Sequence, residues 1–157
     1  MKRLLILLTS FMVLMFASTV AVLSNDQATG SARLHQIDQS GIDARIVFLD
    51  TGTQLIVSGE ATGLDPNQAY ISLVYDRDAL PGGPSACVPS TIPSPITGAQ
   101  MFVGSWIVDQ DGTGTLFTVK TGDSYAAISE IGAVSVRVVD PVSPPDLEAC
   151  GRVHSKK

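Results

Sequence analysis

Histidine and cysteine, the residues that most often hold metals or act as nucleophiles, are few and widely spaced in this chain. It contains two His, His35 and His154, and two Cys, Cys87 and Cys150. A transition-metal site needs several imidazole, thiolate or carboxylate ligands that converge, and a lone imidazole holds such a metal poorly. We therefore expect both histidines to be exposed to solvent, and we predict neither a metal nor a cofactor from these residues.

Two carboxylate patterns also have a simple structural explanation. Asp109-Gln110-Asp111-Gly112 is similar to the start of a calcium loop, but the twelfth position is Lys120, where such a loop needs a bidentate Glu. An Asx-type hairpin turn is therefore the expected structure. Asp76-Arg77-Asp78 places a cation between two carboxylates, which favours a solvated ion cluster over general acid–base catalysis.

The sequence offers no pattern for nucleophilic or phosphate chemistry. No Ser lies in a GxSxG elbow, and no Gly-rich loop leads into a convincing helix. The aromatic residues Tyr70, Tyr75, Phe102 and Trp106 lie in expected strands, where a place in the core is favoured over a ligand platform. These observations favour a non-catalytic protein over an enzyme.

The first residues have the composition of an export signal. Lys2 and Arg3 precede an apolar run, Leu4 to Leu23, which ends in small residues that suit cleavage near Ala21 or Ser24. We predict that residues 1–24 are a signal peptide and that the protein is secreted or extracytoplasmic. Because the run is long enough to cross a bilayer of about 30 Å, a membrane anchor formed by residues 4–23 is the alternative.

Charge limits the partners of the exported protein. Without Lys2 and Arg3, eight basic residues remain against 15 acidic ones, which gives a net charge of −7. Such an acidic protein repels nucleic acid and anionic lipid, so the expected partner is a protein or a cell-envelope component, with membrane contact only through an uncleaved leader. The acidic residues are scattered, which indicates solubility more than an acidic interaction tail.

The two cysteines are predicted to form a disulfide. Both follow the leader, and an oxidising compartment makes a Cys87–Cys150 bond the default. Closing a loop of about 63 residues would constrain the unfolded chain by about 4 kcal/mol in the loop-entropy model.

Short β-runs separated by turn residues predict an all-β domain. We expect a polar linker over residues 25–40, a β-domain over residues 41–154 and a tail over residues 155–157. Between residues 124 and 131 the pattern fits one helical turn or an irregular crossing. Six or seven strands at this spacing indicate an antiparallel Greek-key sandwich or barrel. The expected strands are 42–49, 54–61, 69–75, 101–109, 113–119, 133–139 and 150–154.

The order of these pieces resembles the copper/zinc superoxide dismutase family over about residues 42–153. The segment 57–66, VSGEATGLDP, is similar to that family's strand and GLxPG turn, and Ala69 to Tyr75 matches the strand that carries its HxH pair. Cys87 falls where the family's disulfide Cys opens the long metal loop. Val103-Gly104 resembles the HVGDLGN strand, Val138-Val139 the VVH strand, and Ala149-Cys150-Gly151 the C-terminal ACG.

The metal ligands that this resemblance would imply are absent. The HxH strand reads Ser72-Leu73-Val74-Tyr75, the His and Asp that flank Val-Gly become Phe102 and Ser105, and the last copper His becomes Asp140. Replacing imidazoles by apolar and hydroxyl side chains removes the redox chemistry. The resemblance therefore implies a scaffold without dismutase activity.

Three functions remain open at this stage. The first is a non-catalytic binding or structural module that uses the loop Asp76 to Gln100 or the face around Tyr75 and Trp106. The second is a divergent dismutase or metal-handling protein that uses Asp140, Asp76, His35 or His154. The third is an immunoglobulin-like adhesion module, because Trp106 lies between two cysteines. The candidate binding surface consists of Tyr75, Asp76, Arg77, Asp78, Phe102, Ser105, Trp106 and Asp140.

Overall fold

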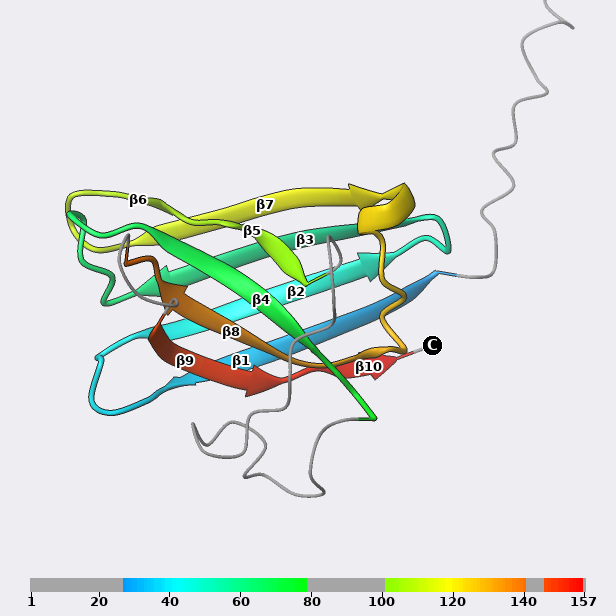
Figure 1. Cartoon of the computed structure of the whole chain (residues 1–157), viewed down its shortest axis with the longest axis horizontal. Helices are drawn as coiled ribbons and strands as arrows, with labels where there is room; N and C mark the ends of the chain where they lie inside the picture. Colours follow the sequence, from blue (N-terminus) through cyan, green and yellow to red (C-terminus); the bar gives the residue numbers. More distant parts are fainter. Residues whose placement is uncertain (1–26, 79–100, 141–145, 157) are drawn as a thin grey trace, which may run out of the picture.

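The computed structural model of the protein describes residues 27–78, 101–140 and 146–156, so the predicted leader, Cys87 and most of the loop 76–100 lie outside the described residues. The described chain forms ten β-strands and one 3-10 turn (Figure 1). The strands are β1 (Ala28–Gln36), β2 (Asp43–Asp50), β3 (Gln54–Thr62), β4 (Tyr70–Asp76), β5 (Phe102–Ser105), β6 (Ile107–Val108), β7 (Gly114–Thr121), β8 (Ile131–Val138), β9 (Asp146–Arg152) and β10 (His154–Lys156).

The strands form two layers in which every pairing is antiparallel. They are hydrogen-bonded in the order β5-β4-β8-β9-β1-β2-β3-β7-β6, and β10 also pairs with β1. We call the layer of β1, β2, β3, β7, β6 and β10 sheet A, and the layer of β5, β4, β8 and β9 sheet B. In Figure 1, β4 and β8 cross in front of the strands of sheet A.

Two segments belong to both layers and nearly close the sandwich into a barrel. Residues 28–34 of β1 pair with β2 in sheet A, whereas His35 and Gln36 at its end pair with β9 in sheet B. On the opposite side, β5 pairs with β4, and β6 pairs with β7. Only Trp106 separates β5 from β6, so a single extended segment passes from one sheet to the other. Sharing strands in this way reduces the unpaired edges of both sheets.

The connections follow a Greek key. β4, the segment formed by β5 and β6, and β7 follow one another as neighbours, and β7 then pairs with β3, which precedes them in the chain. The all-β Greek-key class predicted from the sequence is therefore confirmed.

The turn chemistry at Asp109–Thr113 is also confirmed, because the amide of Thr113 donates to Asp111 Oδ1 over 3.0 Å. This hydrogen bond, with a further one from the side chain of Thr113, lowers the pKa of Asp111.

The main core lies between the two sheets and follows from alternation along each strand. In β2, Ala44, Ile46 and Phe48 are at most 1% exposed, while their neighbours face solvent. Trp106 enters this core at the point where the chain changes sheets, and its indole Nε1 donates to Ser72 Oγ over 2.9 Å. The core placement predicted for Trp106 is therefore confirmed, and its one polar atom is satisfied.

The predicted linker over residues 25–40 is wrong, because residues 28–36 form β1. The segment looks polar since its outward positions carry Arg33 and His35, yet Ala32 and Leu34 alternate with them and are at most 1% exposed. Gly30 adds to the misleading composition, although it is buried where a Cβ would collide with Ile128. The tail predicted from residue 155 is wrong as well, since β10 extends to Lys156.

A buried carboxylate ties the crossover between β7 and β8 to the β2–β3 hairpin. The crossover starts as a 3-10 turn, Gly122–Ser124, and continues irregularly, as expected. Asp50, only 5% exposed, accepts hydrogen bonds from the Tyr125 hydroxyl over 2.8 Å and the Ile128 amide over 2.9 Å. It also accepts one from the Gly52 amide in its own hairpin over 2.8 Å. The same side chain thus fixes two loops that are distant in sequence.

Replacing this carboxylate is expected to be costly. Asp50→Ala leaves the buried Ile128 amide without its acceptor, so we expect the free energy of unfolding to fall by about 3 kcal/mol. Asp43→Ala is the matched control, since it removes a carboxylate whose ion pair with Arg33, at 3.2 Å, is exposed. That control should lose less than about 1 kcal/mol. Urea unfolding followed by circular dichroism measures both, and equal losses would contradict the role assigned to Asp50.

The same contact predicts sensitivity to alkaline pH. Partial burial, helped by the hydrogen bond and charge of Asp50, raises the pKa of Tyr125 to about 12. An unfolded Tyr titrates near pH 10, so the folded state keeps this proton longer. The stabilisation is complete below about pH 10 and is lost as the pH rises towards 12. Unfolding free energies across this range should fall more steeply for the native protein than for Tyr125→Phe, and parallel curves would refute the assignment.

Candidate functional site

The outer face of sheet B, which faces away from the main core, is buried. Leu73 and Tyr75 of β4, Ala133 of β8 and Cys150 of β9 form a second apolar cluster there, each at most 8% exposed. The partly buried residues packed against it are Ile37, Ile71, Met101 and Leu147. Cys150 is not a free thiol, but Cys87 lies outside the described residues, so the disulfide between them stays a prediction.

Three polar side chains form a hydrogen-bonded network within this face. The Tyr75 hydroxyl lies 2.8 Å from Ser135 Oγ, and Arg137 Nε donates to the Tyr75 hydroxyl over 3.0 Å. Tyr75 and Ser135 are both fully buried, and Arg137 is half-buried. Tyr75 was predicted as a site residue, but Ser135 and Arg137 were not. The signal was available in the alternation of β8, which places residues 133, 135 and 137 on the same face as Tyr75.

This face does not fit the copper and zinc that the resemblance would imply. In the strand that matches the HxH pair, Leu73 offers no donor atom and Ser72 faces the opposite side, where it accepts from Trp106. The Tyr75 hydroxyl already contacts Ser135 and a guanidinium, whose positive charge opposes a nearby metal cation. No group of three His, Cys, Asp or Glu side chains that could hold a metal occurs in the described parts of the chain.

The triplet Asp76-Arg77-Asp78 does not form the predicted ion cluster. The Arg77 guanidinium instead donates to the backbone carbonyl of Ile131 over 2.9 Å and to Ser155 Oγ over 3.2 Å. Asp76 Oδ1 accepts from the backbone amide of Asp78, which makes a local turn. No ion pair joins Arg77 to a carboxylate within the described residues, and its guanidinium instead links the start of β8 to β10.

The rest of the predicted surface is dispersed over the molecule. Phe102 is 40% exposed at the seam between β5 and β7, where Lys120 Nζ lies 5.6 Å from its ring centroid. Ser105 ends β5 and is exposed, whereas Trp106 is in the main core. Asp140 follows β8 near Tyr70, at the end of β4 opposite to Asp76. The structure therefore does not bring these eight residues together on one surface.

Asp140 belongs to an acidic end of the barrel. With Asp65, Asp146 and Glu148 it lines a depression of about 490 Å³. Partial burial, together with the nearby charges of Asp146 and Asp38, raises the pKa of Glu148. Both histidines face solvent, so the exposure predicted for His35 and His154 is confirmed.

The most unusual surface is the outer face of β2, β3 and β7, which sequence analysis did not single out. We call it the sheet A face. Three exposed apolar side chains lie on it: Val47 at 39%, Phe117 at 72% and Val119 at 46% exposure. The strand register arranges the central outward residues in three rows, which are Leu49–Ile56–Val119, Val47–Ser58–Phe117 and Arg45–Glu60–Thr115. The rows beyond them, Asp43–Thr62 and Gln54–Thr121, are polar. Two of the three rows are therefore mainly apolar.

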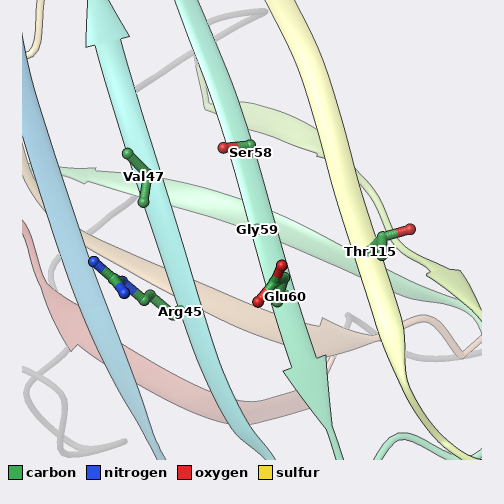
Figure 2. A pocket seen from close by; sticks show the side chains of 6 residues that line it. All are labelled: Arg45, Val47, Ser58, Gly59, Glu60 and Thr115. Carbon is green, nitrogen blue, oxygen red and sulfur yellow. The ribbon is translucent and has the colours of Figure 1, made fainter.

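A shallow depression of about 350 Å³ marks the charged end of the sheet A face (Figure 2). Arg45 on β2 and Glu60 on β3 are direct cross-strand partners, but the Arg45 guanidinium extends towards β1, away from Glu60. The ion pair found within the described residues is Arg33–Asp43, and neither the Arg45 nor the Glu60 side chain takes part in a hydrogen bond or ion pair there. Two opposite charges thus lie side by side on an exposed face, each without a partner among the described residues.

The buried network gives a prediction about stability. Tyr75→Phe keeps the packed ring but removes the hydroxyl that contacts Ser135 and Arg137, so we expect a loss of about 2 kcal/mol of unfolding free energy. Tyr70→Phe is the matched control, because its hydroxyl accepts only a backbone amide of the exposed turn residue Asp65. That change should cost about 1 kcal/mol or less. A Tyr75→Phe protein as stable as the control in urea would contradict a role for the network.

Within the described residues, no helix is long and apolar enough to cross a membrane. Comparison of the chain with protein-family models and with curated proteins finds no match.

Proposed function

We propose that this protein is an exported, non-catalytic β-sandwich module that binds a protein partner through the sheet A face. The observation that carries the proposal is the exposure of Val47, Phe117 and Val119 on adjacent strands of that face. The outer face of an antiparallel sheet that meets water normally carries polar side chains. Contiguous apolar surface with a charged border is instead typical of protein–protein contact sites.

The half-buried residues of the sheet A face extend its apolar area. Leu49 and Ile56 are direct cross-strand partners in the first row, next to Val119. An apolar centre gives binding energy, while charges at its border give specificity. A protein surface satisfies both requirements, because it can supply apolar side chains and fixed opposite charges together.

The buried outer face of sheet B supports a non-catalytic role. In the dismutase family that the sequence resembles, activity depends on metal ligands, and here Leu73 and the engaged Tyr75 stand on the matching strand. Residues 72–75 are packed and hydrogen-bonded on both sides of the sheet, so this region stabilises the fold. The scaffold is thus proposed to be superoxide dismutase-like, with binding in place of redox turnover.

The position of Cys150 favours this scaffold over an immunoglobulin-like one. An immunoglobulin disulfide lies between the sheets against the buried Trp. Cys150 instead packs in the outer cluster of sheet B with Leu73 and Tyr75, whereas Trp106 is in the main core. Export through a cleaved leader and a Cys87–Cys150 disulfide remain parts of the same proposal, supported by the apolar run of residues 4–23 and by the two cysteines.

Site-specific photo-crosslinking tests the binding role. A photoreactive amino acid replaces Phe117, which is 72% exposed on the sheet A face, in cells that export the protein. We expect covalent adducts with protein at this position and none with the same amino acid at Asn67, an exposed turn residue away from the face. Absence of adducts at position 117, or equal labelling at both positions, would rule out this face as the binding surface.

Metal analysis tests the non-catalytic part separately. The purified protein is exposed to copper and zinc, freed of excess ions and analysed by mass spectrometry. Substoichiometric metal and no chelator-sensitive dismutase activity are expected, because the matching strand lacks imidazoles. Stoichiometric metal with chelator-sensitive superoxide dismutation would reject the proposal in favour of a divergent dismutase.

A further inference from the structure

We infer that the partner seated on the sheet A face is a second copy of this chain, related by a two-fold axis that runs along the strands between β2 and β3. The inference rests on the proposed function, since it identifies the occupant of the same face. A two-fold interface uses the same patch on both copies, so that patch must be complementary to itself. The register of β2 and β3 meets this requirement.

The two-fold operation exchanges the strands of the face, β2 with β3 and β1 with β7, and keeps each row of residues at the same height. An axis parallel to the strands, midway between β2 and β3, brings each residue of β2 opposite the β3 residue of the same row in the other copy. The cross-strand pairs within one chain are Leu49–Ile56, Val47–Ser58 and Arg45–Glu60. The contacts between copies would therefore join Leu49 to Ile56, Val47 to Ser58 and Arg45 to Glu60.

Each of these contacts is chemically compatible. The first row packs apolar side chains against apolar side chains, and the second places a small hydroxyl against Val47. On the next strands outward, the axis exchanges β1 with β7. The exposed Phe117 of one copy would therefore cover Ser31 of the other copy. Face-to-face sheets align with a rotation of about 30°, so the match is best near the axis, where the β2 and β3 residues lie.

The charged row selects this axis among the alternatives. The Arg45 and Glu60 side chains, which extend apart in Figure 2, have no partners among the described residues of one chain. The two-fold would form two reciprocal ion pairs between copies. An axis between β3 and β7 would instead place Glu60 opposite Thr115 and leave Arg45 unmatched. Arg33, which lies beside Arg45 on β1, already pairs with Asp43 and therefore does not compete for Glu60.

The size of the face predicts a reversible dimer. Four strands spaced about 4.8 Å apart, each with about eight residues that rise about 3.4 Å, cover about 500 Å² on each copy. The total of about 1,000 Å² lies at the lower limit for specific interfaces. We therefore expect a concentration-dependent equilibrium between monomer and dimer, and not an obligate dimer.

Charge reversal with mixing tests the inference. Sedimentation equilibrium of the purified protein should show a monomer–dimer equilibrium. Arg45→Glu places two carboxylates opposite each other at both symmetric contacts, and Glu60→Arg places two cations there. Each variant alone should self-associate at least about a hundredfold more weakly than the native protein. Glu130→Arg, the same charge change at an exposed position outside the sheet A face, should leave self-association unchanged.

An equimolar mixture of the two variants gives the decisive result. In the mixed dimer, the carboxylate introduced at position 45 of one copy would meet the guanidinium introduced at position 60 of the other. At the second contact the native Glu60 of the first copy would meet the native Arg45 of the second, so opposite charges are restored at both contacts. We expect the mixture to dimerise about as well as the native protein, whereas neither component does so alone. Because both components are present in the same folded form in each measurement, recovery on mixing cannot come from repair of a misfolded variant.

Three results would overturn the inference: a native protein that stays monomeric at every concentration, a dimer that the single reversals do not weaken, or variants that do not recover on mixing. The proposed function is tested by different readouts. A monomeric protein that still forms adducts with other proteins at position 117 would keep the binding role and assign the face to a different partner. Stoichiometric metal with dismutase activity would reject the non-catalytic role whatever the oligomeric state.

Discussion

Every part of this fold depends on the two segments that belong to both sheets. Because β1 pairs with β2 and then with β9, and the segment 102–108 pairs with β4 and then with β7, the two sheets share most of their edges. Trp106 lies at the second crossing and fills the core between the sheets, where its indole nitrogen is bound by Ser72. Closure at both sides fixes the strand order, and with it the side chains that face outward on each sheet.

Closure also gives the two outer faces different roles. On sheet B the outward side chains are buried around Tyr75, Ser135 and Arg137, so this face stabilises the protein. On sheet A the outward side chains include Phe117 and Val119, which remain exposed although they are apolar. We therefore propose that the binding capacity of this barrel lies on the sheet A face, because burial of its exposed apolar groups would still gain free energy.

Most of the fold could be predicted from the sequence, because alternation and turn residues are local signals. The turn at Asp109–Thr113 is an example, since the Asp111 carboxylate accepts the hydrogen bond that forms the expected turn. The first strand was missed because Gly30 and exposed Arg33 hide the alternation of Ala32 and Leu34. The candidate surface could not be predicted in the same way. Asp76 ends β4 and Asp140 follows β8, but only the antiparallel register of these two strands shows that the residues lie at opposite ends.

The sheet A face needed register as well as sequence to be recognised. Phe117 and Val119 alternate with Leu116 and Thr118 in the sequence, but nothing local shows that Val47, Ile56 and Leu49 lie in the same rows. The same register places Arg45 next to Glu60. Two charged side chains that form no ion pair within one chain are costly to bury unless a second molecule supplies their partners. We propose that a face combining apolar rows with two unmatched opposite charges is complementary to its own two-fold copy. The pairing of β2 with β3, which builds sheet A, therefore also builds the proposed recognition surface.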